Sequence, residues 1–159
     1  MKKLHIVSNR LPFSVVDTND EPSLQPSVGG LATGMNSVYK DFNGKWIGWS
    51  GIASDEQEPS KLVQIEKLLS HEGCETVHLT SDEVESFYEG FCNNTIWPLF
   101  HYFAQYVDFQ PEFWDAYVAV NQKFADKTLE VVDDGDFVWV HDYQLMLVPE
   151  MIKSKRPNI

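Results

Sequence analysis

The chain has 159 residues, of which 43% are hydrophobic and 13% aromatic, so it can bury the core of one domain and is not a disordered segment. It carries 12 basic and 24 acidic residues, and the interval 68–122 holds nine acidic residues and no Lys or Arg. Such a surface would repel a phosphate backbone, which argues against nucleic-acid binding.

The cysteines and the N-terminus set the expected compartment. Cys74 and Cys92 form no CxxC pair and have no suitably spaced His, which predicts free thiols in a reducing compartment rather than a metal site. The first apolar run stops after four residues at Ser8, too short for a signal peptide or a membrane span. We therefore expect a soluble cytoplasmic protein with no membrane contact, no metal and no cofactor.

Hydrophobic periodicity predicts strands that alternate with helices. The predicted strands are 4–7, 45–51, 76–79 and 137–140. The predicted helices are 31–43, 59–71, a helix that starts with a capping box at 80–83 and is interrupted near Gly90, 111–133 and 143–153. Residues 17–26 are interpreted as a polar connection, and the uniformly apolar strand 137–140 is expected to be buried on both faces. This alternation predicts an α/β domain with a mostly parallel sheet and flanking helices.

Two adjacent glycines, Gly29 and Gly30, precede the first predicted helix. Glycine accepts positive φ and lets another atom approach its backbone closely. Free N–H groups at a helix N-terminus attract anions, which makes a phosphate the first candidate ligand. The alternative is a tight turn in which glycine serves geometry alone.

Polar clusters follow three of the predicted strands, at 8–10, 49–51 and 141–143. Ligands of open parallel sheets sit beyond the carboxyl ends of the strands, so these clusters should share one edge. Arg10 is the only Lys or Arg between Lys3 and Lys40. Its guanidinium suits a phosphate, and a carboxylate such as Asp142 suits sugar hydroxyls.

Aromatic residues would complete such a site, since Tyr88 and Trp97 could cover the apolar face of a sugar ring. Each residue also has a structural alternative. Arg10 would pair with a neighbouring carboxylate, Asp142 would cap the following helix, and Trp97 would belong to the core. Their joint placement at predicted strand ends favours a sugar-phosphate site.

Five blocks of sequence resemble the trehalose-6-phosphate synthases in order and approximate spacing. They are HIVSNRLP at 5–12, GGLA at 29–32, WSG at 49–51, YEGFCNNTIWP at 88–98 and VHDY at 140–143. The resemblance runs from Leu4 to Pro157. It implies a retaining glucosyltransferase of the GT-B fold, with a Rossmann-like N-terminal domain, that moves glucose from UDP-glucose to glucose 6-phosphate and releases UDP.

The resemblance also implies roles for individual residues. Arg10 matches the contact to the acceptor phosphate, and Tyr88 matches its partner there. Trp97 matches the aromatic wall of the acceptor pocket, and Asp142 the carboxylate that holds acceptor hydroxyls. Gly30 matches the glycine whose backbone approaches the nucleotide sugar.

Further residues of these blocks, Gly29, Trp49 and His141, are assigned only to the lining of the cleft. The family's donor-side histidine and UDP-binding domain would follow residue 159. The resemblance therefore implies that residues 1–159 are an incomplete, acceptor-side N-terminal domain without a catalytic residue or a C-terminal nucleotide-sugar domain, inactive by itself.

Two alternatives stay open: a synthase that glucosylates glycerol 3-phosphate, and a non-catalytic regulatory subunit of a trehalose-synthesising complex. A non-catalytic subunit would have no chemical reason to retain Arg10, Tyr88, Trp97 and Asp142 together. Assembly as a homo-oligomer or within such a complex is also left open.

Overall fold

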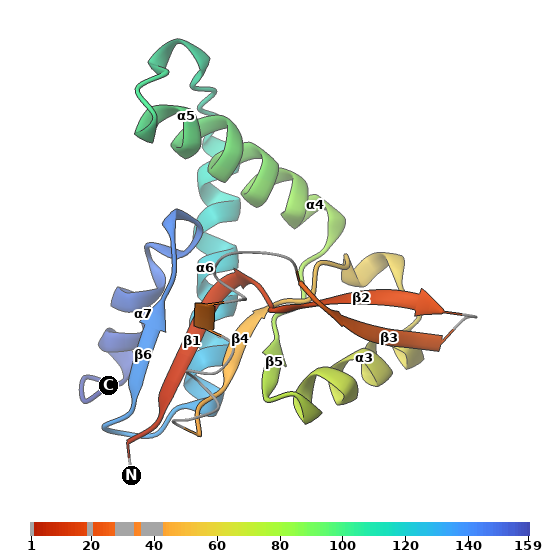
Figure 1. The fold of residues 1–159 in the computed structure, drawn as a ribbon. Coiled ribbons are helices and arrows are strands. Elements are labelled where there is room, and N and C mark those ends of the chain that lie inside the picture. Colours follow the sequence, from red (N-terminus) through yellow and green to blue (C-terminus); the bar gives the residue numbers. More distant parts are fainter. Residues whose placement is uncertain (1, 19–20, 28–33, 36–42) are drawn as a thin grey trace.

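The computed structural model describes residues 2–18, 21–27, 34–35 and 43–159. Its centre is a parallel sheet in the order β5-β4-β1-β6 (Figure 1). The strands are β1 (Leu4–Arg10), β4 (Trp46–Trp49), β5 (Cys74–Thr76) and β6 (Phe137–Val140). The predicted α/β class with a parallel sheet is confirmed.

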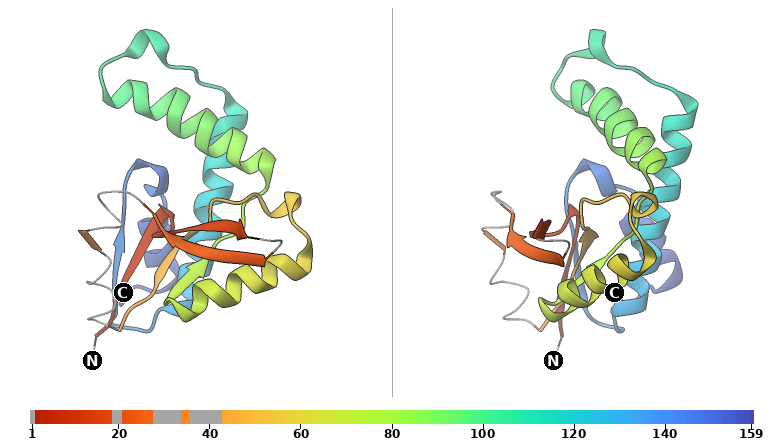
Figure 2. Two further views of the ribbon diagram at one scale, coloured as in Figure 1. Left: turned by 45° about the vertical axis from the view of Figure 1, so that its right-hand side comes forward. Right: turned by 90° about the vertical axis from the view of Figure 1, so that its right-hand side faces the viewer.

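Each face of the sheet has its own core because successive strand residues point to opposite sides. Ile6 and Trp46 pack on one face with α3 (Pro59–His71) and a hairpin. Val7 and Ile47 pack on the other face with α6 (Pro111–Val131), α7 (Val148–Lys155) and the segment that precedes α6. Figure 2 shows helices on both sides of the sheet.

The hairpin of β2 (Phe13–Thr18) and β3 (Glu21–Pro26) corrects the prediction of a polar connection over 17–26. The prolines there argued against strands. A two-stranded hairpin tolerates them because each of its strands has an unpaired edge, where a missing N–H costs no ladder bond.

The helix predicted to break near Gly90 does not break. Helical structure continues through α4 (Ser81–Glu83), the π-helical η2 (Val84–Ile96) and α5 (Trp97–Phe100). The predicted capping box between Thr80 and Glu83 is present at its start. A Cβ on Gly90 would lie 2.7 Å from the Phe113 ring, so glycine allows close packing against α6 rather than ending the helix.

Two strand predictions also need correction. The third strand is Cys74–Thr76 rather than 76–79, although Val77 N–H still donates to Gly48 O at 2.8 Å. β6 is not buried on both faces, since Phe137 and Trp139 are 58% and 47% exposed. The reason is its position at the edge of the described sheet, beyond the part that α3 and the hairpin cover.

The remaining helix predictions are largely confirmed. α3 and α6 match 59–71 and 111–133, and a short 3₁₀ turn η4 (Tyr143–Leu145) followed by α7 accounts for 143–153. Of the helix predicted over 31–43, Gly34 and Met35 are helical, Asn43 lies in a turn, and the other residues lie outside the described ones.

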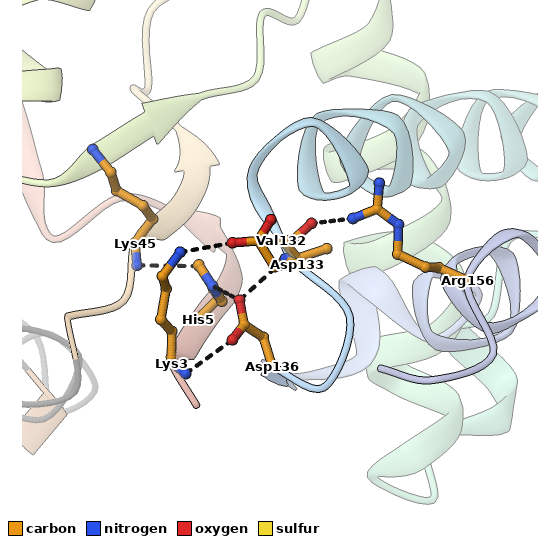
Figure 3. A network of polar contacts seen from close by, with 7 residues as sticks. All are labelled: Lys3, His5, Lys45, Val132, Asp133, Asp136 and Arg156. Atoms are coloured by element: carbon orange, nitrogen blue, oxygen red, sulfur yellow. Dashed lines mark hydrogen bonds and ion pairs between the residues drawn. The ribbon is translucent and has the colours of Figure 1, made fainter. Parts of the chain in front are cut away.

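A buried polar network joins the start of β1 to the loop before β6 (Figure 3). Asp136 Oδ1 accepts from the backbone N–H of Lys3 at 2.9 Å, and its Oδ2 accepts from that of Asp133 at 3.1 Å. His5 Nε2 lies 3.1 Å from Asp136 Oδ2, while His5 Nδ1 accepts from Lys45 N–H at 3.2 Å. His5 therefore donates to Asp136 as a neutral ring.

We expect Asp136→Ala to lower the free energy of unfolding at pH 7 by about 1–3 kcal/mol, because it leaves buried donors without an acceptor. Burial raises the pKa of Asp136, but the N–H groups of Lys3 and Asp133 together with His5 outweigh it and hold the pKa below its usual value. The stabilisation is therefore full above about pH 3.9 and is lost as the pH falls through the lower folded-state pKa.

Denaturant unfolding at several pH values measures this effect. Asp115→Ala, which removes an exposed carboxylate from α6, is the matched control. Equal losses in the two variants at pH 7, or a loss in Asp136→Ala that persists unchanged in acid, would contradict the role of the network.

Candidate functional site

The polar clusters at the carboxyl ends of β1, β4 and β6 share one edge of the sheet, as predicted. Arg10 is in register with Trp49 of β4, and Leu11 N–H donates to Trp49 O at 2.9 Å. On the other side of β1, His141 N–H donates to Val7 O at 2.8 Å. Figure 1 shows that the carboxyl ends of β1 and β6 point toward the long helical segment from α4 to α5. The site lies between these elements.

Arg10 ends β1 with its guanidinium over the indole of Trp49, at 4.9 Å from Cζ to the ring centroid. Trp49 is only 5% exposed and is held by an Nε1–H bond to Ile52 O at 2.9 Å. Trp49 thus supports Arg10 from within the core. Among the described residues no carboxylate pairs with Arg10, so the ion-pair alternative has no support there.

Tyr88 acts electrostatically on Arg10. Partial burial lowers the pKa of Arg10, and the charge interaction with Tyr88 offsets part of this shift. Burial also raises the pKa of Tyr143 to about 12, and the nearby Asp142 and Tyr88 add to that shift. Tyr88 of η2 therefore lies within electrostatic reach of both Arg10 and the turn after β6. Arg10 stays protonated at neutral pH, since an arginine ordinarily titrates above about pH 12.

Trp97 lies at the start of α5 and is 49% exposed, so it is not a core residue. Its ring lies 5.6 Å from that of Tyr143 and 3.8 Å from that of His101. An exposed aromatic face next to Tyr143 can cover the apolar face of a sugar ring. The core alternative for Trp97 is thereby excluded.

Asp142 has φ +72°, a conformation that costs free energy in residues other than glycine. Its Oδ1 accepts from Tyr143 N–H at 2.8 Å and caps η4, so the capping alternative is present in the structure. The side chain is nonetheless exposed. One oxygen of Asp142 holds the turn while the carboxylate faces solvent at the sheet edge.

Three buried polar atoms near this edge have no hydrogen-bond partner among the described residues: Oδ1 of Asn9, Nε2 of His141 and Oγ1 of Thr76, the last residue of β5. Unsatisfied buried groups are costly and gather at functional sites. Burial lowers the pKa of His141 despite an opposing effect of Asp142, so its ring is neutral at pH 7. Asn9 was part of a predicted cluster but not a predicted contact; its position directly before Arg10 was the available signal.

Tyr143 and Gly51 are the other neighbours that sequence reasoning did not assign. Both belong to the predicted clusters at 141–143 and 49–51, but the contacts of Tyr143 with Trp97 and of Gly51 with Arg10 depend on the tertiary structure. Gly29 and Gly30 lie outside the described residues.

Within the described part of the chain, no group of three or more His, Cys, Asp or Glu is placed to hold a metal ion. None of the described helices combines the length and apolarity that crossing a membrane requires. The described part of the candidate site therefore offers one guanidinium without an ion-pair partner, from Arg10, and one exposed carboxylate, from Asp142. The rings of Trp97 and Tyr143 add an aromatic wall. Together these groups suit an anionic, hydroxyl-rich small molecule.

The fold thus defines an α/β protein with a parallel sheet, and its carboxyl edge carries a candidate small-molecule site. The model of Glycosyltransferase family 20 matches residues 2–159, and the chain belongs to this family. A bifunctional trehalose-6-phosphate synthase/phosphatase of Thermoproteus tenax is 41% identical over 96% of this chain and 21% of its own length.

Two solved structures share the fold, which matches that of GT-B trehalose-phosphate synthases. One is the E. coli enzyme bound with UDP-2-fluoro glucose, with a TM-score of 0.73 and 29% identity over 97% of this chain and 30% of that one. The other is an alpha,alpha-trehalose-phosphate synthase (UDP-forming) from Burkholderia xenovorans in complex with glucose-6-phosphate. It has a TM-score of 0.68 and 27% identity over 96% of this chain and 31% of that one. The chain therefore spans about a fifth to a third of the length of these relatives.

Proposed function

We propose that this chain is the acceptor-side, Rossmann-like domain of a UDP-forming trehalose-6-phosphate synthase. The complete enzyme would transfer glucose from UDP-glucose to glucose 6-phosphate with retention of configuration. The observation that carries the proposal is the guanidinium of Arg10, which lies over Trp49 at the carboxyl edge of the sheet with no carboxylate partner among the described residues. A free, positioned guanidinium suits a phosphate.

The other groups suit the sugar of the same acceptor. Trp97 and Tyr143 offer adjacent aromatic faces, and Asp142 presents an exposed carboxylate to hydroxyls. The proposal assigns the phosphate to Arg10 with Tyr88, the hexose to Trp97 and Asp142, and the donor to Gly30. It further assigns Gly29, Trp49 and His141 to the lining of the cleft. Relatives solved with a UDP-glucose analogue and with glucose 6-phosphate support this choice of ligands.

The reaction itself would be carried largely by electrostatic stabilisation of the departing UDP. In this scheme the present residues bind and orient the acceptor. Arg10 fixes the phosphate end, and the carboxylate of Asp142 accepts hydrogen bonds from the hydroxyls. A sugar held at both ends meets the donor with one hydroxyl on the same face as the departing phosphate, as retention requires, and this replaces a bimolecular encounter by an oriented one.

Turnover by the complete protein tests the proposal. With UDP-glucose as donor, we expect UDP release coupled to trehalose 6-phosphate formation with glucose 6-phosphate, and a much lower kcat/KM with glycerol 3-phosphate. A higher kcat/KM with glycerol 3-phosphate would instead identify a glucosylglycerol-phosphate synthase. Binding of both ligands without turnover would favour the regulatory subunit.

A further inference from the structure

Gly51 lies where a side chain would occupy the position of the Arg10 guanidinium. The residue has φ +89°, a conformation that glycine adopts readily and other residues rarely do. A Cβ built on Gly51 would lie 2.1 Å from one terminal nitrogen of Arg10 and 2.5 Å from its Cζ. Both distances are far shorter than a van der Waals contact.

We propose that Gly51 is a positioning residue that sets the preference for a phosphorylated acceptor, because its missing side chain leaves room for the Arg10 guanidinium. This inference rests on the proposed function, in which Arg10 binds the acceptor phosphate. Gly51 itself contacts no substrate in this scheme. It acts through Arg10.

The slot that holds the guanidinium has rigid walls. On one side is the indole of Trp49, fixed by its bond to Ile52 O and by core packing. On the other is the backbone at Gly51. The path of β1 is fixed as well, since Leu11 N–H donates to Trp49 O directly after Arg10. With walls made of backbone and a buried ring, the part that must move to admit a Cβ is the flexible end of Arg10.

A displaced guanidinium would find other partners nearby. Trp49 and Gly51 also line a hollow of about 320 Å³. Its remaining walls include the carboxylate side chains of Glu56, Glu85 and Glu89. An arginine turned into this hollow would be attracted to carboxylates rather than to a phosphate. The slot at Gly51 therefore keeps the one free cation of this strand end away from competing acidic groups.

The test is Gly51→Ala in the complete protein, with kcat/KM measured for glucose 6-phosphate and for unphosphorylated glucose. We expect the ratio of the two values to fall by about tenfold or more, as for the loss of a charge-assisted hydrogen bond. Catalysis with glucose itself should change little. A merely structural role would lower both values together and leave the ratio unchanged.

Gly135→Ala is the matched control for backbone strain. Gly135 has φ +88°, almost the value of Gly51, and a Cβ there would meet only Lys2 Cε at 3.9 Å among the described residues. Both variants should lose similar thermal stability, but only Gly51→Ala should change the acceptor preference. Should Gly51→Ala fail to fold, Gly51→Asn supplies a Cβ on a residue that tolerates positive φ better.

A double-mutant cycle separates this inference from the function on which it rests. If Gly51 acts through Arg10, Gly51→Ala should not lower the preference further in an Arg10→Ala background. Additive effects would overturn the positioning role. An unchanged preference in Arg10→Ala alone would overturn the proposed phosphate site instead, whereas a normal preference in Gly51→Ala or Gly51→Asn with a sensitive Arg10→Ala would overturn only the role of Gly51.

Discussion

Arg10→Ala in the complete protein should raise KM for glucose 6-phosphate by about ten- to a hundredfold and remove most of its advantage over glucose. The expected size follows from charge-assisted hydrogen bonds, whose loss costs about 1.5–3 kcal/mol. Arg10 stands without an ion-pair partner among the described residues, so its removal leaves no unpaired carboxylate and should spare the fold. Steady-state kinetics with saturating UDP-glucose and a thermal melt measure both points.

Asp142→Asn is the companion variant for the sugar end of the acceptor. The amide oxygen can still accept from Tyr143 N–H, and asparagine tolerates the positive φ at this position. The loss of charge should therefore weaken glucose and glucose 6-phosphate alike. If Arg10→Ala keeps the preference for the phosphorylated sugar, or if Asp142→Asn removes that preference, the two ends of the acceptor have been assigned incorrectly.

Trp97→Ala should weaken acceptor binding by about tenfold while the affinity for UDP stays unchanged, because in the proposed site the indole contacts the acceptor alone. Its ring is half exposed and adjacent to Tyr143, so its removal opens no cavity in the core. Titration of the two ligands, followed by calorimetry or protein fluorescence, measures the two affinities.

Phe103→Ala is the matched control for this variant. Phe103 is 52% exposed, comes shortly after Trp97 in the chain, and its ring lies 6.2 Å from that of Tyr106. Phe103→Ala should leave the affinities for the acceptor and for UDP unchanged. Equal losses for acceptor and UDP in Trp97→Ala would indicate disturbed folding and argue against an aromatic wall.

Local sequence rules determined most helices because their signals lie within a few residues. Pro59 and Gly73 bound α3, and the reciprocal hydrogen bonds of Thr80 and Glu83 start α4. The same rules failed where a contact with a distant part of the chain determines the local structure. The presence of Gly90 predicted a break, but Gly90 lies within a continuous helix. A glycine fits there because the ring of Phe113, from α6, occupies the space that a side chain would take.

The polar clusters at the strand ends illustrate the same division. Their shared edge followed from the parallel sheet, since all strands of such a sheet end on the same side. The predicted burial of β6 on both faces is not found among the described residues, where β6 is an edge strand. Phe137 and Trp139 are apolar and nevertheless exposed, since β6 forms the edge of the described sheet.

By itself, then, the sequence determined the α/β class, the elements with strong local signals and the residue types that gather at one edge. Periodicity, caps and strand ends are short-range properties of the chain. Only the tertiary structure decided that Trp49 lies beneath Arg10, that Trp97 is exposed beside Tyr143, and that Gly51 leaves a slot for a guanidinium. These contacts join residues from different elements, and their distances depend on the packing of the whole domain.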